Sequence, residues 1–192
     1  MKKIPTLFKR IYDEKHNKSI TTEVTPGMEW VLNGEGIATI KIDGTCCAII
    51  DGVFYRRYDA KHGKVPPANA IACCEPDPIT GHWPHWLPVD ESDKGAFWHI
   101  EAYRNSDGEN LEDGTYEAIG PHFRSNPYEL DKDILVKHGA EIVEVPRSFE
   151  GLKDYLEKHV IEGIVFWKDG EPQCKIKRSD FGFKWPAGGV KE

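Results

Sequence analysis

Long apolar runs are missing from this 192-residue sequence, and no stretch approaches the length that a membrane-spanning helix requires. It also has no internal repeat, no low-complexity tract and no long Gly/Ser linker. Met1-Lys2-Lys3 and the polar residues that follow do not resemble a secretory signal. We therefore expect one compact domain over residues 1–192, monomeric and without membrane contact, inside the cell in the cytoplasm or nucleus.

An excess of positive charge is also missing. The chain has 25 Lys and Arg against 32 Asp and Glu, which gives a formal net charge of −7. Domains that bind nucleic acid through bulk charge are usually basic, so this balance argues against that mode of binding. Any nucleic-acid contact must therefore be local, in a basic cleft. The segment Lys175–Lys184 is basic, whereas Asp107–Asp113 is acidic.

Cysteines are few and poorly spaced for disulfides. There are 5, of which Cys46-Cys47 and Cys73-Cys74 are adjacent in the chain. Neighbouring cysteines seldom bridge each other, so a reducing compartment is expected. Cys73-Cys74 could form a zinc site with His82 and His85, but adjacent cysteines lack the two-residue gap of such sites. Packed thiols in an ordered loop are the preferred interpretation.

Short apolar runs between turn signals predict an α+β fold with antiparallel sheets. The Asp51-Gly52 pair is a strong hairpin signal. The expected strands are Ile37–Ile42, Cys46–Ile50, Val53–Arg57, Trp98–Tyr103, Gly114–Ile119, Ile142–Val145, Gly163–Trp167 and Gln173–Ile176. A helix capped by Ser148 should run to Lys158, and a shorter one is expected over Asp131–His138 with Gly139 as its stop. Pro66–Val89 is expected to be an ordered loop.

Lys41-Ile42-Asp43-Gly44 is the first candidate for chemistry, at the end of a strand and the start of a turn. A nucleophilic lysine must lose its proton, and burial beside other cations allows this. A glycine lets the backbone approach a phosphate closely. The tetrapeptide alone is a weak signal, because an ordinary hairpin turn with a solvated lysine has the same sequence.

The hairpin places an arginine near this loop. A two-residue turn pairs Ile50 with Val53, which sets Cys46 opposite Arg57 and brings Arg57 beside Lys41–Gly44. A surface arginine on a strand is the ordinary alternative.

Two carboxylates and two lysines complete the set. Glu117 lies within an expected strand and could simply face solvent, whereas Glu162 leads into an apolar run and is expected to point into a cleft. Lys175 and Lys177 alternate, so they share one strand face. A solvated sheet edge is the other interpretation of these lysines.

In this order, the elements resemble the motifs of the covalent nucleotidyltransferase superfamily of ligases and capping enzymes. Lys41–Gly44 looks like motif I, Arg57 like motif Ia and Tyr116-Glu117 like motif III; Glu162–Val165 looks like motif IV and Lys175–Lys177 like motif V. The sequence resembles most closely the single-domain, vertebrate-type, ATP-dependent 5′-to-3′ RNA ligases. The segments that carry this closer likeness are Lys41–Cys47, Glu75–Pro78, Gly81–Pro84, Ile119-Gly120, Asn126–Tyr128, Glu162–Val165 and Phe183–Pro186.

The resemblance implies a nucleotidyltransferase (ATP-grasp-like ligase adenylation) domain without an OB domain, which joins RNA 5′-phosphate and 3′-hydroxyl ends. Lys41 would carry AMP from ATP, with Mg²⁺, or Mn²⁺ in its place, as the metal cofactor. The implied nucleotide-binding residues are Ile40, Asp43, Gly44, Arg57, Glu117, Glu162, Lys175 and Lys177. Of these, Asp43, Glu117 and Glu162 would hold the metal through waters. The alternatives are a GTP-dependent mRNA capping guanylyltransferase and an inactive nucleotide- or RNA-binding module.

Overall fold

The structure is a computed structural model that describes residues 3–12, 14, 18–60, 64–78 and 80–186. Its chain forms two compact units, and passes from one to the other after Ile42 and back after His138. We call Asp43–His138 the central unit, and Ile4–Ile42 together with the chain from Gly139 onward the flanking unit. A single adenylyltransferase domain over residues 1–192 stays a prediction.

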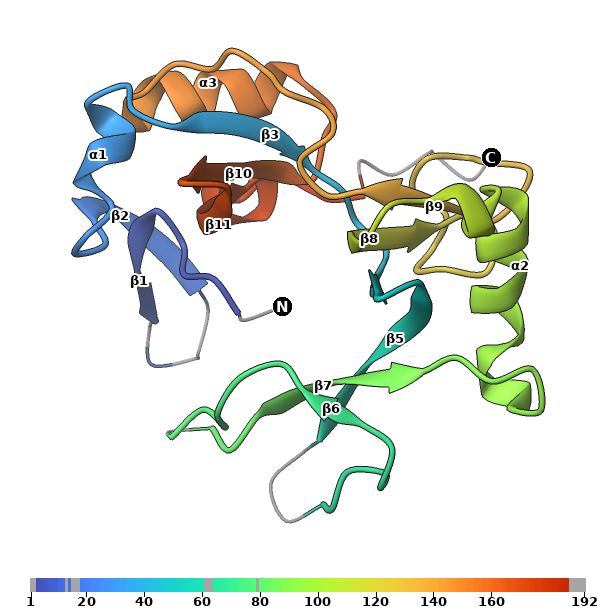
Figure 1. The fold of residues 1–192 in the computed structure, drawn as a ribbon. Helices are drawn as coiled ribbons and strands as arrows, with labels where there is room; N and C mark the ends of the chain where they lie inside the picture. The colour runs from blue at the N-terminus through green and yellow to red at the C-terminus, as the bar shows by residue number, and fades with distance from the viewer. Residues whose placement is uncertain (1–2, 13, 15–17, 61–63, 79, 187–192) are drawn as a thin grey trace. The chain divides into compact units, whose positions relative to one another are not determined.

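The flanking unit contains two antiparallel sheets and one long helix (Figure 1). Its elements are β1 (Phe8–Tyr12), β2 (Lys18–Val24), α1 (Glu29–Leu32), β3 (Ile37–Lys41), α3 (Phe149–Lys158), β10 (Gly163–Lys168), β11 (Glu171–Lys177) and the 3-10 helix η3 (Arg178–Phe181). The strands β1 and β2 pair with each other, and the second sheet has the order β11-β10-β3. Thr6 forms a bridge with Lys175, so the chain before β1 covers part of the outer edge of β11.

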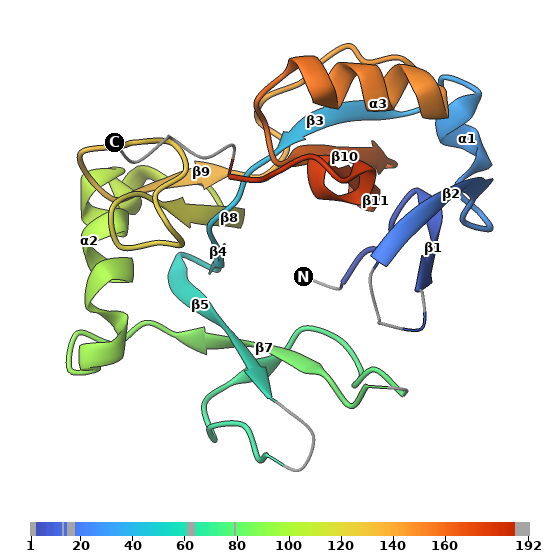
Figure 2. The ribbon, with the colours of Figure 1, turned by 180° about the vertical axis from the view of Figure 1, so that it is seen from behind.

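Helix α3 lies against the three-stranded sheet, as both ribbon views show (Figures 1 and 2). Leu152 and Leu156 are fully buried there, in one core with Ile164 and Phe166. The helix begins where the sequence predicts, because the Ser148 hydroxyl accepts a hydrogen bond from the backbone N–H of Gly151.

The central unit is built on one antiparallel sheet of order β6-β7-β5-β4-β8-β9. Its elements are β4 (Thr45–Ile50), β5 (Val53–Ala60), β6 (Ile71–Ala72), β7 (Trp83–Pro88), η1 (Lys94–Ala96), α2 (Phe97–Asn105), η2 (Gly108–Asn110), β8 (Gly114–Ile119) and β9 (Ile134–Lys137). The predicted hairpin is confirmed: Ile50 pairs with Val53, and Asp51 and Gly52 both have positive φ, of 51° and 71°. Both units are therefore mixed α and β structures with antiparallel sheets and few helices, which is compatible with the predicted α+β class.

Two predictions assigned the wrong type of element. Trp98–Tyr103, expected as a strand, lies in helix α2. Its aromatic residues favour strands, but the helix buries Ala102 and stacks Tyr103 on Phe54, so tertiary packing overrides local preference. Asp131–His138, expected as a helix, contains strand β9, because β-branched residues there pair with β8.

Two further segments also differ from expectation. Pro66–Val89 is not only a loop, since β7 pairs along β5 despite its two prolines. Ile142–Val145 forms no strand; only Ile142 makes a bridge, with Thr39. The strands β1 and β2 were not predicted at all. None of the helices in the described ranges is long and apolar enough to cross a membrane.

Candidate functional site

Strand register brings three site residues of the flanking unit into one row. Lys41 is the last residue of β3 and pairs with Gly163, the first residue of β10. Gly163 also pairs with Lys177, the last residue of β11. Partners on adjacent antiparallel strands share a face, and the central member of this row has no side chain. The two lysines therefore stand on either side of a glycine.

A glycine is required at that position. A Cβ on Gly163 would lie 2.2 Å from the carbonyl oxygen of Ile176. Because this neighbour is backbone, it cannot move aside as a flexible side chain could. The packing of β10 against β11 thus excludes a side chain at residue 163 itself, which leaves the space between the two lysines to another residue.

Glu162 occupies that space with its carboxylate. Its Oε2 lies 2.6 Å from Nζ of Lys41, and its Oε1 accepts a hydrogen bond from Nζ of Lys177. Glu162 is buried, with 4% of its surface exposed, while the lysines reach solvent partly. The interpretation of Glu162 as an acid that points inward is thus supported by its burial and its partners. One buried carboxylate fixes the directions of two ammonium groups.

Lys175 adds a third lysine with an unusual acidity. Burial, and after it the nearby charges of Lys41, Lys177 and Arg10, together lower its pKa to about 8, against the opposing effect of Glu162. This is the combination of burial and neighbouring cations that the sequence analysis expects around Lys41. Lys175 does not lie on a solvated sheet edge. Its backbone N–H donates to the carbonyl of Pro5, and its carbonyl accepts a hydrogen bond from the N–H of Leu7.

Arg10 is a cation of this group that sequence analysis missed. Its Nη2 lies 3.0 Å from Oδ1 of the buried Asp180, and among the described residues its buried Nε has no hydrogen-bond partner. No motif of the sequence marks Arg10, and the strand β1 that carries it was not predicted. We call these four cations the lysine cluster: Lys41, Lys175, Lys177 and Arg10. Their carboxylate partners are Glu162 and Asp180, so positive charge is in excess and the cluster suits an anion such as a phosphate.

In the central unit, side chains hold the turn that follows Lys41 in sequence. The Asp43 N–H donates to the Tyr128 hydroxyl at 2.7 Å, and the Gly44 N–H donates to Oε1 of Glu117 at 3.0 Å. Arg124 Nε donates to the Gly44 carbonyl at 3.0 Å and lies 3.7 Å from Oδ1 of Asp43. These bonds are the local reason for the fixed backbone at Asp43 and Gly44.

Gly44 is required by the packing of the chain around it. A Cβ at this position would lie 2.1 Å from the carbonyl oxygen of Ala118. In the other unit, Ile40 has its N–H bonded to the carbonyl of Glu141 at 3.0 Å, and its predicted adenine contact stays a prediction.

Glu117 does not face solvent, which was the ordinary interpretation of a carboxylate on an alternating strand. It is buried, and its second oxygen lies 2.7 Å from Nε2 of His138. His138 is not among the candidate site residues that the sequence indicates. Only the pairing of β8 and β9 brings this histidine to Glu117.

The predicted hairpin places Arg57 on β5, while its position beside the Lys41–Gly44 loop stays a prediction. The register of β4 and β5 extends from the turn to the pair of Cys47 and Arg56, and the charge of the next residue, Arg57, acts on the Cys46 thiol. Burial lowers the pKa of Arg57, but the hydrogen bond to Asp59 at 2.7 Å and the charge of Asp59, with smaller effects of Cys46 and Cys73, together outweigh it and raise the pKa overall. The contact of Arg57 with a phosphate stays a prediction.

The site residues thus form two sets, each inside one unit. Lys41, Glu162, Lys175 and Lys177 meet in the flanking unit, and Gly44 and Glu117 meet in the central unit. The first set defines a strand-end lysine fixed by a buried carboxylate among further cations. This arrangement is suited to covalent or ionic chemistry with phosphates.

Comparison with known proteins agrees with the motifs. No family model matches the chain. It is 28% identical over 138 residues to "RNA ligase 1" of Danio rerio, which covers 55% of this chain and 42% of that protein. It is 24% identical over 226 residues to "RNA ligase 1" of Pongo abelii and 25% identical over 227 residues to that of Rattus norvegicus; each covers 78% of this chain and 68% of the relative. The chain thus spans less than half the length of the zebrafish relative, and its resemblance to vertebrate RNA ligases is confirmed.

Proposed function

We propose that this chain is an ATP-dependent RNA ligase that joins 5′-phosphate and 3′-hydroxyl RNA ends through a covalent lysyl-AMP. The observation that carries the proposal is the fixed position of Lys41, whose Nζ lies 2.6 Å from Glu162 beside two further lysines. Support also comes from relatives named RNA ligase 1.

In the first step the neutral amine of Lys41 attacks the α-phosphorus of ATP. The phosphorus–nitrogen bond forms, the bond to the β-phosphate oxygen breaks, and pyrophosphate leaves. Glu162 holds the Lys41 nitrogen in one direction, which supplies positioning. Lys177 shares the same carboxylate, and Lys175 and Arg10 add positive charge for the phosphates.

Two later steps complete the joining. The RNA 5′-phosphate takes AMP from Lys41, which frees the lysine and gives a 5′-5′ pyrophosphate. The RNA 3′-hydroxyl then attacks the 5′-phosphorus, and AMP leaves. Arg57, Asp43 and Gly44 are proposed to contact the nucleotide or the RNA phosphate, as the resemblance implies.

Carboxylate oxygens are ligands that Mg²⁺ prefers, so Asp43, Glu117 and Glu162 fit this ion chemically. Both oxygens of Glu117 and of Glu162 already accept hydrogen bonds within the protein. These two residues therefore suit contacts through metal-bound waters. When bound, Mg²⁺ would neutralise phosphate charge in the transition state.

The test is covalent labelling of the purified protein. It is incubated with Mg²⁺ and either α-labelled ATP or α-labelled GTP, and the product is analysed on a denaturing gel and by intact mass. We expect an AMP adduct that is lost in Lys41→Ala and kept in Lys158→Ala, a control at the exposed end of α3. The adenylated protein should then seal nicked or open RNA with a 5′-phosphate.

Other outcomes would contradict the proposal. A GMP adduct would indicate a capping guanylyltransferase. Absence of any adduct, on folded protein whose intact mass shows no AMP already attached, would favour a binding module. A Lys41→Ala variant that still forms the adduct would exclude Lys41 as the nucleophile.

A further inference from the structure

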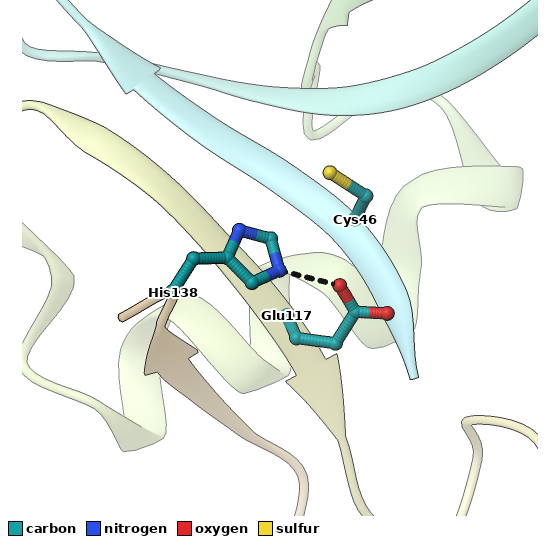
Figure 3. Close-up of side chains that lie close together, drawn as sticks. All are labelled: Cys46, Glu117 and His138. Carbon is teal, nitrogen blue, oxygen red and sulfur yellow. Dashed lines mark hydrogen bonds and ion pairs between the residues drawn. The ribbon is translucent and has the colours of Figure 1, made fainter. Parts of the chain in front are cut away.

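Three side chains with metal-binding atoms lie together on one face of the central sheet (Figure 3). Cys46 on β4 pairs directly with Glu117 on β8. The backbone N–H of His138 donates to the carbonyl of Thr115, so these two residues lie opposite each other. Thr115 is two residues before Glu117 on β8, and both side chains therefore lie on the same face of the sheet. Cys Sγ, a His nitrogen and a Glu oxygen all lie within 4.8 Å of one another. The register of three adjacent strands thus produces the group, which we call the Cys-Glu-His group.

The distances are close to those of a metal site. Tetrahedral coordination by sulfur at about 2.3 Å and by nitrogen and oxygen at about 2.1 Å places ligand atoms roughly 3.4 to 3.6 Å apart. The His138–Glu117 pair, at 2.7 Å, must open by a fraction of an ångström, and the Cys46 sulfur must approach the other two atoms.

The surroundings already orient two of the three ligands. His138 Nδ1 lies 2.9 Å from the Thr115 hydroxyl, which leaves Nε2 directed toward Glu117. The other oxygen of Glu117 accepts the Gly44 N–H. Such outer contacts are typical of metal-binding histidines and carboxylates, because they fix the ring and the carboxylate before the ion arrives.

Charge and ligand softness select the kind of ion. Burial, and after it the charge of Glu117, raises the pKa of the Cys46 thiol to about 12, so a bound cation would have to displace the thiol proton. The resulting thiolate, the carboxylate and a neutral imidazole have a total charge of −2, which balances a divalent cation. The positive charge nearest to Cys46, on Arg57, is paired with Asp59. Mg²⁺ and Ca²⁺ prefer oxygen ligands, whereas sulfur and imidazole nitrogen suit zinc and its neighbours.

We propose that Cys46, Glu117 and His138 form a binding site for a divalent cation of the zinc class, with a fourth position open to water or another ligand. Glu117 is common to this site and to the proposed magnesium contacts, but the thiol and the imidazole beside it are ligands that Mg²⁺ does not prefer. Among the described residues, no other group of three His, Cys, Asp or Glu side chains has ligand atoms this close, including the Cys73-Cys74 region.

Cobalt(II) is the probe, because a thiolate ligand gives it a charge-transfer absorption band in the near ultraviolet. Chelator-treated, reduced protein is titrated with Co²⁺ and then with Zn²⁺ as competitor. We expect one equivalent to produce the band and Zn²⁺ to abolish it. Cys46→Ala should lose the band, and His138→Gln should weaken Co²⁺ binding at least about tenfold. The matched control Cys73→Ala removes another partly exposed thiol and should keep both band and affinity.

A second readout does not depend on the cobalt spectrum. Zn²⁺ should raise the Tm of the native sequence and of Cys73→Ala but not that of Cys46→Ala, whose circular dichroism must match the native protein. Failure of Co²⁺ to give a band, an unchanged band in Cys46→Ala, or its loss in Cys73→Ala would overturn the proposal. Because neither readout uses nucleotide or ligation, this proposal and the ligase proposal can fail separately.

Discussion

Replacing Lys175 with methionine should stabilise the protein near neutral pH while it weakens adenylation. The pKa of Lys175 falls from 10.5 to about 8 on folding, because the site buries this lysine beside Lys41, Lys177 and Arg10. A fall of the pKa by about 2.5, at about 1.4 kcal/mol for each tenfold change, corresponds to at most about 3.5 kcal/mol. The folded protein bears this cost to hold the charge, and methionine removes it at similar length.

The pH dependence isolates the charge from other effects of the substitution. A lysine whose pKa is lowered by folding binds more protons in the unfolded chain between about pH 8 and 10.5, so stability rises with pH through that window. The native protein therefore recovers stability as Lys175 loses its proton, and Lys175→Met has nothing to recover. The advantage of the variant should fall from about 3 kcal/mol at about pH 7 to roughly 1.5 kcal/mol at about pH 9.5.

Urea unfolding of both proteins at the two pH values measures this double difference. Lys158→Met, which changes an exposed lysine at the end of α3, serves as the control and should give the same difference from the native protein at both pH values. A Lys175→Met advantage that does not change with pH would refute the reasoning, and so would destabilisation by this variant at neutral pH. The first result would mean that the effect of Lys175→Met on the free energy of unfolding comes from packing and not from the charge of the lysine.

Two further changes test the geometry around the site. Gly44→Ala should lower the free energy of unfolding by about 2 kcal/mol or more, because its Cβ would overlap the Ala118 carbonyl; urea unfolding measures this, and a change below about 0.5 kcal/mol would contradict the close packing. Glu162→Gln should reduce the rate of adenylation at least about tenfold, because Lys41 and Lys177 lose their shared charged partner. Single-turnover labelling measures that rate, and an unchanged rate in a folded variant would show that Glu162 does not position Lys41.

Predictions from short stretches of sequence were correct where a residue's own backbone preference or hydrogen bond decides the structure. Asp51-Gly52 fixed the hairpin because both residues tolerate positive φ, and Ser148 fixed the start of α3 because its hydroxyl satisfies a free N–H. Local signals failed over 98–103 and 131–138. In both segments, contacts with residues distant in sequence decide the element, as when Ala102 is buried or Val136 pairs with Glu117.

The sequence by itself determined the order of the candidate motifs, the strand that begins at Ile37 and carries Lys41, and the hairpin that pairs Ile50 with Val53. These depend on residue type and on spacing within a few positions. Tertiary structure alone decided that Glu162 lies between Lys41 and Lys177 and that His138 reaches Glu117. Each of these meetings joins strands from separate parts of the chain, and their register is set by the packing of whole sheets.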